Sequence, residues 1–484
     1  MHKACCWLLA LSGCSVSMAD SDGKAPTPTT DSPPNIIVLL ADDLGYGDLS
    51  SYGHPSIRTP QLDRLASEGQ RWTDFYVSAP ICSPSRGALM TGKYPTRSGL
   101  YGRKNGVAWP KSDTQIPDDE ITLPEALQNA GYETVMFGKW HLGDKPQALP
   151  TRHGFDRWVG LPYSNDMDHP EFDWRAVKGG AMRAQFDKFM QLSADPDSRH
   201  WNVTLYSSEK TGQAYQDKIV EKPVDLSTLT PLYTKEAVSY IKQRSADNKP
   251  FFMYLAYTAP HTPIYPGAVF SGKSLRGKYG DAVEEIDWSV GQIRSALDAE
   301  GLSRNTLIVF SSDNGPDGIS KDNGSAGLLR GKKGTVFEGG MRVPAIFWWP
   351  GKIKSGLVSD LGALMDVYAV SVSLAGGRVD PSKMDAVDLS PALFAGQASP
   401  RTELLYHSNS GEILGYRHGR YKILVTKDGV TKSDSSAPLL YDLQEDPSEA
   451  WDLSSKEKAV ADRMVKEMQA RKALIEIKEP LFDR

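Results

Sequence analysis

Continuous runs of apolar residues recur along the chain, and each run stops at polar or charged residues. Four of these runs occupy residues 35–40, 133–137, 251–257 and 306–310. Unbroken apolar runs of this length are typical of parallel strands buried on both faces, whereas a strand with one wet face alternates between apolar and polar residues. We therefore predict that these four segments form the centre of a sheet.

Segments with helical signals lie between the predicted strands. One begins at Thr59-Pro60, another begins with the Thr-Leu-Pro-Glu capping box of residues 122–125, and a third covers residues 234–244. This alternation of strand and helix indicates an α/β fold, with a mainly parallel sheet and helices on both of its faces.

Residues suited to chemistry follow the predicted strands directly. In sheets of this kind, ligands bind beyond the carboxyl ends of the strands. The residues concerned are Asp42, Asp43, Lys139, His141, His261, Asp313 and Asn314. We expect them to meet at one edge of the sheet, although they lie far apart in the sequence.

The pattern changes near residue 376. Shorter strand candidates follow around residues 404–406, 415–417, 421–425 and 439–442, and an amphipathic helix follows at about residues 456–473. We predict a large domain over residues 35–376 and a smaller α+β subdomain, with a short antiparallel sheet, over residues 377–484.

The segment before that boundary contains one stretch without a clear pattern. Residues 171–224 are polar and weakly periodic, and we interpret them as an insertion near the mouth of the site. Just before it, Asp166, Asp168 and His169 are either substrate contacts or part of an ordinary surface loop.

Composition narrows the class of protein. The chain has 484 residues, of which 40% are hydrophobic and 24% charged, as in soluble globular proteins. Its net charge of −5 argues against a dedicated nucleic-acid binder, and we expect no nucleic-acid partner. Three of the four cysteines lie within the first fourteen residues, so Cys82 has no partner for a disulfide in the rest of the chain.

The first residues resemble a bacterial export signal. An apolar run at residues 4–11 is too short to span a bilayer, and Leu11-Ser12-Gly13-Cys14 resembles a lipobox that would make Cys14 a lipidated residue. Cleavage after Ala19 is the alternative. We therefore expect a signal peptide at residues 1–19 and a flexible tether at residues 20–34. The protein is then either an outer-membrane lipoprotein, bound to the membrane lipid through Cys14, or a soluble periplasmic protein.

The segment Cys82-Ser83-Pro84-Ser85-Arg86 is similar to the motif in which the sulfatase family oxidises a cysteine to formylglycine. Other blocks that resemble this family, in the family's order, are residues 35–43, 138–143, 260–263, 313–315 and 334–340. The resemblance extends over residues 34–453 and is strongest to arylsulfatase-like members. It implies an alkaline-phosphatase-like fold, in which helices sandwich a large mixed, mainly parallel sheet.

The resemblance also implies a metal site beside Cys82. Asp42, Asp43, Asp313 and Asn314 offer oxygen ligands only, and oxygen ligands suit a hard cation such as Ca²⁺ or Mg²⁺ better than zinc. The family favours Ca²⁺, which would also contact the formylglycine at position 82.

The mechanism that the resemblance implies uses the hydrate of formylglycine as the nucleophile. One hydroxyl at position 82 attacks sulfur, a covalent sulfo-enzyme intermediate forms, and loss of a proton from the second hydroxyl expels sulfate. His141 resembles the base for that release. Lys139, His261 and Lys333 resemble the groups that bind sulfate, with His261 as the proton donor, and Lys332 is an alternative to Lys333. Arg86 adds a positive charge near the start of the helix expected after Pro84.

We therefore expect an exported sulfuric ester hydrolase that acts on a sulfated carbohydrate and depends on a formylglycine-generating maturation enzyme. One alternative is a phosphodiesterase or phosphonate hydrolase of the same superfamily. The other is a non-catalytic glycan-binding lipoprotein. Release of sulfate rather than phosphate would distinguish a sulfatase from the phosphodiesterase or phosphonate hydrolase. Unmodified Cys82 would favour the glycan-binding lipoprotein.

Overall fold

The computed structural model describes residues 33–176, 182–245, 249–318, 323–431 and 437–484. The predicted export signal and nearly all of the predicted tether lie outside these residues. In the part of the chain that the structure describes, no helix combines the length and the apolar character needed to cross a membrane.

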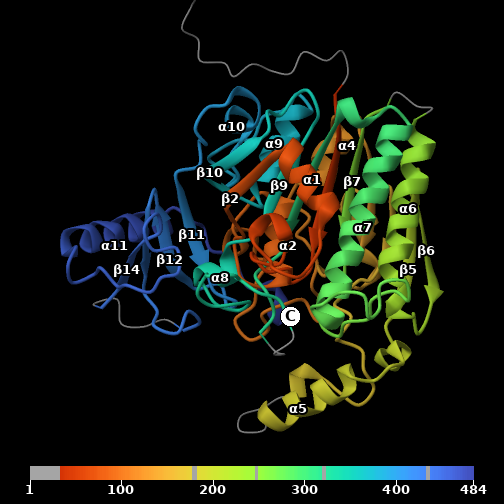
Figure 1. Ribbon diagram of the computed structural model, residues 1–484, viewed down its shortest axis with the longest axis horizontal. Helices are drawn as coiled ribbons and strands as arrows, with labels where there is room; N and C mark the ends of the chain where they lie inside the picture. Colours follow the sequence, from red (N-terminus) through yellow and green to blue (C-terminus); the bar gives the residue numbers. More distant parts are fainter. Residues whose placement is uncertain (1–32, 177–181, 246–248, 319–322, 432–436) are drawn as a thin grey trace, which may run out of the picture.

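A ten-stranded mixed sheet forms the centre of the molecule (Figure 1). In spatial order its strands are β10 (Gly356–Ala363), β2 (Gln70–Tyr76), β9 (Ala345–Trp348), β8 (Thr306–Ser312), β1 (Asn35–Ala41), β7 (Phe251–Ala256), β3 (Glu133–Gly138), β4 (Arg157–Gly160), β5 (Leu205–Thr211) and β6 (Ala214–Glu221). The central strands β8, β1, β7, β3 and β4 are all parallel. The predicted α/β fold is confirmed.

The continuous apolar run of β1 is explained by cores on both faces of the sheet. Ile36, Val38 and Leu40 face one core, whereas Ile37 and Leu39 face the other, and all five are fully buried. The first core includes residues from α2 (Cys82–Thr91), α4 (Leu123–Asn129) and α9 (Asp366–Leu374). The second includes residues from α1 (Pro60–Glu68), α6 (Leu229–Arg244) and α7 (Gly277–Ala299).

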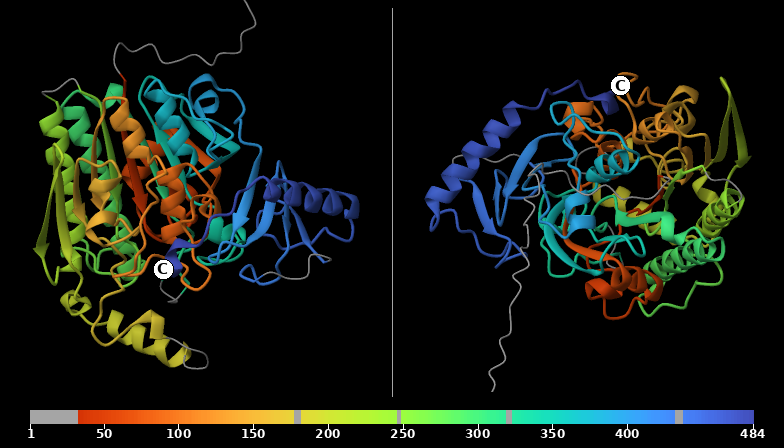
Figure 2. Two further views of the ribbon diagram at one scale, coloured as in Figure 1. Left: turned by 180° about the vertical axis from the view of Figure 1, so that it is seen from behind. Right: turned by 90° about the horizontal axis from the view of Figure 1, so that it is seen from above.

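A separate antiparallel sheet lies to one side of the large sheet (Figures 1 and 2). It consists of β11 (Glu403–His407), β12 (Ile413–His418), β13 (Tyr421–Leu424) and β14 (Leu439–Asp442), and α11 (Lys458–Ala473) packs against it. The chain also forms the short helices α3 (Pro95–Ser98), α8 (Glu338–Met341) and α10 (Ser390–Ala395). The sequence predicted these four strands and the last helix within a few residues.

Residues 171–224, which the sequence suggested as an insertion near the mouth of the site, contain regular elements that their weak periodicity did not reveal. The segment contains α5 (Met182–Ser193) and the hairpin of β5 and β6, which extends the large sheet. Every residue of β6 is exposed, so this edge strand has no buried face to impose an alternating pattern. Figure 1 shows α5 projecting beyond the body of the molecule.

Candidate active site

The carboxyl ends of β1 and β8 are tied together by side chains just beyond the strands. The amide of Asp43 donates to Asp313 Oδ1 at 3.2 Å, and the amide of Leu44 donates to Ser312 Oγ at 3.0 Å. Asp43 has a positive φ of 64°, which is uncommon outside glycine and turns the chain sharply after the strand. The two loops therefore hold Asp42, Asp43 and Asp313 at one edge of the sheet, as the sequence predicted.

Buried oxygen atoms in this cluster lack hydrogen-bond partners. Asp42, Asp43, Asp313 and Asn314 are at most 1% exposed. Asn314 Nδ2 donates to Asp43 Oδ1 at 2.6 Å, but Asn314 Oδ1 and Asp42 Oδ1 accept no hydrogen bond. Carboxylate and amide oxygens left free in this way fit a hard divalent cation.

Two of these residues, Asp42 and Asp43, also belong to a group of four side chains that could hold a metal ion. One ligand atom each of Asp42, Asp43, Cys82 and His261 lies within 4.8 Å of the others. Burial and the neighbouring Asp42 carboxylate raise the pKa of Asp313 above its usual range, so the crowded acids would gain from a cation.

Three cations surround the carboxylates. Lys139 Nζ lies 2.6 Å from Asp42 Oδ2, Lys333 Nζ lies 2.8 Å from Asp43 Oδ2, and the Arg86 guanidinium lies 2.8 Å from Asp313 Oδ2. Burial alone would raise the pKa of Asp42 and of Asp43, but Lys139 and Lys333 hold both pKa values below the usual range. Both carboxylates are therefore ionised, and each is paired with a lysine.

Cys82 is the first residue of α2, and its side chain faces this ionic cluster. The residue is 2% exposed, and burial raises the pKa of its thiol to about 12. An unmodified Cys82 would therefore be a protonated, weak nucleophile at neutral pH. Ile81 precedes α2 without a side-chain cap, Pro84 has no N–H, and the amide of Ser85 donates to the Ile81 carbonyl, so Cys82 and Ser83 carry the amides that an anion could meet at the start of the helix.

The two predicted histidines occupy different environments. His141 is 1% exposed, and neither of its ring nitrogens has a hydrogen-bond partner. Burial and the charge of Lys139 hold the pKa of His141 well below its usual range, so its imidazole is neutral and can accept a proton. His261 Nδ1 lies 2.5 Å from the Thr262 carbonyl, which leaves Nε2 toward Asp43 Oδ2 at 3.5 Å.

The structure separates two groups of expected residues. Lys333 reaches the cluster, whereas Lys332 Nζ donates to the Gly318 carbonyl instead. Asp166 accepts from the indole of Trp174, Asp168 from Tyr163, and His169 from the amide of Glu171. Asp168 also lies 3.8 Å from Lys222 Nζ, so these contacts connect the three residues to the surrounding chain.

One residue in contact with the cluster escaped the sequence analysis. Ser164 Oγ accepts from Lys139 Nζ at 3.1 Å, and the residue is 1% exposed. It follows β4, a strand that the sequence did not reveal, so its position beyond a strand end could not be recognised.

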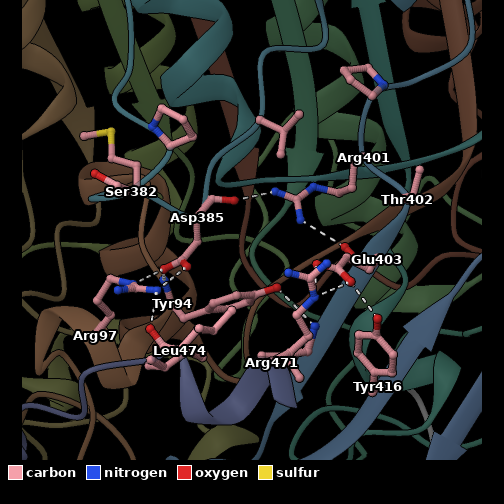
Figure 3. A pocket seen from close by; sticks show the side chains of 16 residues that line it. Tyr94, Arg97, Ser382, Asp385, Arg401, Thr402, Glu403, Tyr416, Arg471 and Leu474 are labelled. Atoms are coloured by element: carbon pink, nitrogen blue, oxygen red, sulfur yellow. Dashed lines mark hydrogen bonds and ion pairs between the residues drawn. The ribbon is translucent and has the colours of Figure 1, made fainter. Parts of the chain in front are cut away.

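A cavity away from this cluster is a poor candidate for the reaction (Figure 3). It has a volume of about 440 Å³ and is lined in part by Arg97, Asp385, Glu403 and Arg471. Arg97 pairs with Asp385 at 2.9 Å and Arg471 pairs with Glu403 at 2.9 Å, so these charges are satisfied. None of its lining residues belongs to the cluster around Cys82.

Comparisons with known proteins agree with this geometry. The family profile described as sulfatase matches residues 34–377. N-acetylgalactosamine-6-sulfatase of Mus musculus is 39% identical over 455 residues, which cover 87% of this chain and 82% of that protein. Arylsulfatase A of Homo sapiens is 37% identical over 472 residues, covering 93% and 88%.

Solved structures agree as well. The PsFucS1 sulfatase from Pseudoalteromonas sp. superposes with a TM-score of 0.78 and 29% identity, covering 91% of this chain and 90% of that one. Ps i-CgsB, solved in complex with k-i-k-neocarrahexaose, gives a TM-score of 0.73 and 30% identity, covering 93% and 94%.

Proposed function

The chain belongs to the sulfatase family and is a sulfuric ester hydrolase, and from this premise we propose that it desulfates a carbohydrate through a formylglycine made from Cys82. The observation that carries the proposal is the position of Cys82. It begins α2 beside Lys139, Lys333 and four buried oxygen-bearing side chains. A weakly acidic, buried thiol is a poor nucleophile there, whereas a hydrated aldehyde offers two hydroxyl groups.

The residues divide the work by charge and proton transfer. Lys139, Lys333 and the first amides of α2 bind the sulfate oxygens, and the buried oxygens of Asp42, Asp43, Asp313 and Asn314 would hold the cation. When bound, Ca²⁺ or Mg²⁺ supplies positive charge that polarises the sulfate. As the attacking hydroxyl bonds to sulfur, it gives its proton to a carboxylate of the cluster; the bond between sulfur and the ester oxygen breaks, and that oxygen leaves with a proton from His261.

The second half of the reaction uses His141. Its neutral imidazole takes the proton of the remaining hydroxyl at position 82. The bond between the carbon that bears this hydroxyl and the sulfate oxygen then breaks, and the aldehyde returns. Water then restores the hydrate, so that one sulfate ester and one water give one alcohol and one hydrogensulfate.

The substrate class rests on the relatives. Two of them are an N-acetylgalactosamine-6-sulfatase and an enzyme solved with a neocarrahexaose, and both names point to sulfated carbohydrate. The decisive experiment measures sulfate release from a panel of sulfated polysaccharides and their oligosaccharides, with Cys82→Ala as the control. We expect release from at least one substrate and none by the variant.

The same assay separates the rival functions. Phosphate release from a diester or phosphonate, without sulfate release, would favour a phosphodiesterase or phosphonate hydrolase. Binding of a glycan without any turnover, with Cys82 unmodified in protein from its native host, would favour a glycan-binding lipoprotein.

We further propose that the protein is exported and matured before it acts. The lipobox-like residues 11–14 support lipidation of Cys14 and attachment to an outer membrane, and cleavage after Ala19 would give a soluble periplasmic protein. A formylglycine-generating enzyme must oxidise Cys82 first. The mass of the mature N-terminal peptide distinguishes the two products, because only the lipoprotein carries acyl chains on Cys14.

A further inference from the structure

A small cavity of about 20 Å³ lies beside His261. The segment after β7 forms one wall and includes His261 itself, Pro263 and Thr258. The opposite wall comes from Glu285 on α7, and Asn165 also lines the cavity. The cavity thus separates a histidine of the site from a buried carboxylate.

Two buried acceptor atoms on these walls have no donor. Glu285 is 2% exposed; its Oε2 accepts from the amide of Gly267 at 3.0 Å, but Oε1 has no partner. Asn165 is 3% exposed; its Nδ2 donates to the Pro263 carbonyl at 3.1 Å, but Oδ1 has no partner. Unpartnered buried acceptors are rare and usually mark a bound water or ion, because each costs free energy when it is left dry.

We propose that one water molecule occupies this cavity and donates hydrogen bonds to Glu285 Oε1 and Asn165 Oδ1, which makes both side chains positioning residues for His261. A volume of roughly 10–15 Å³ is enough for one water, provided that the site offers two or more polar partners. The cavity meets both conditions. A divalent cation fits less well, because it takes six or more oxygen ligands.

The proposed water connects two side chains that each hydrogen-bond to the backbone of the segment after His261. Asn165 holds the carbonyl of Pro263, two residues after His261, and Glu285 holds the amide of Gly267. A bridge between these two side chains would fix residues 261–267 against α7. The effect on catalysis rests on the proposed function, in which His261 protonates the leaving oxygen.

A crystal structure at high resolution tests the water directly and does not depend on turnover. We expect one density peak within hydrogen-bonding distance of both Glu285 Oε1 and Asn165 Oδ1. An empty cavity, or direct contact between a protonated Glu285 and Asn165, would overturn the proposal. A peak with more than four oxygen neighbours at shorter distances would identify a cation and would also overturn it.

Variants test the positioning role. Glu285→Leu removes both carboxylate oxygens, the acceptor for the proposed water and the acceptor for the amide of Gly267, and should lower kcat about 10-fold while KM changes little, because misplacing a catalytic group costs rate more than ground-state binding. Glu285→Gln keeps an acceptor oxygen and should restore most of kcat. The matched control is Asp287→Leu, on the same helix and 4% exposed, which instead removes acceptors for the amides of Gln61 and Leu62.

The control separates positioning from general destabilisation. Asp287→Leu should lower Tm but leave kcat unchanged. Equal losses of kcat in both leucine variants, or wild-type kcat in Glu285→Leu, would contradict the positioning role. Absence of sulfate release by the wild-type protein would instead reject the proposed function and leave the crystallographic result intact.

Discussion

Lys332 and Lys333 are consecutive lysines, yet they make different contacts. Lys333 Nζ lies 2.8 Å from Asp43 Oδ2, and its side chain is 16% exposed. Lys332 instead donates to the carbonyl of Gly318. The geometry therefore favours Lys333 as the group that meets the sulfate, a choice that the sequence left open.

This pair gives a matched test at the residue scale. Lys333→Met should lower kcat/KM by about 10- to 100-fold, because a hydrogen bond to a charged group contributes roughly 1.5–3 kcal/mol. Lys332→Met should stay within about 3-fold of wild type. Steady-state sulfate release by the two variants measures both values. A larger loss in Lys332→Met would show that Lys332, and not Lys333, meets the sulfate.

Most of the cluster could be predicted because its residues follow recognisable strands. The apolar run of β1 points to Asp42 and Asp43, and that of β8 points to Asp313 and Asn314. Ser164 could not be found in this way, since the four residues of β4 are too few to give a pattern. Asn165 also follows β4, so the sequence contained no sign of the cavity beside His261 either.

At the scale of elements, a strand could be predicted from the sequence when its side chains are buried. Strands in the middle of the large sheet are buried on both faces and read as continuous apolar runs. The edge hairpin of β5 and β6 has no such constraint, and its polar residues gave no strand signal. Its pairing with β4 is decided by the backbone of the sheet rather than by side-chain pattern.

A buried ionic cluster joins the two sheets. Lys422 on β13 lies 2.9 Å from Glu338 on α8 and 2.9 Å from Glu449, and all three side chains are at most 1% exposed. Burial and the neighbouring Glu338 carboxylate raise the pKa of Glu449 to about 7. The folded protein therefore holds a proton on Glu449 under conditions in which the unfolded chain has lost it.

This cluster predicts a pH-dependent effect of Glu449→Gln. In the wild type, the folded pKa lies above the unfolded value of 4.5, so stability falls as pH rises from about 4.5 to 7. Glutamine cannot ionise, and the variant should gain on wild type by about 1–3 kcal/mol across that range. Denaturant unfolding at pH 5 and pH 8 measures the difference. Glu445→Gln, at an exposed side chain, is the control and should track wild type at both pH values.

At the scale of the whole molecule, a cation should stabilise the fold as well as the reaction. Three buried carboxylates meet at the ends of β1 and β8, and a ligand that binds only the folded protein raises its stability. Chelation with EGTA should lower Tm and abolish sulfate release, and Ca²⁺ should restore both at lower concentration than Mg²⁺.

A variant pair checks that the response comes from this cluster. Asp43→Asn should lose the calcium-dependent rise in Tm, whereas Asp380→Asn, at a side chain 51% exposed, should keep it. A calcium response that survives in Asp43→Asn would place the cation elsewhere.

The fate of the sulfate group tests directly whether residue 82 is the nucleophile. His141→Gln should still allow attack on sulfur but should block the proton transfer that expels sulfate from position 82. After incubation with a sulfated substrate, mass spectrometry of the peptide that carries residue 82 should show formylglycine hydrate plus one SO₃ group. If the wild-type protein releases sulfate while its own residue-82 peptide contains only unmodified cysteine, formylglycine at residue 82 is not the nucleophile.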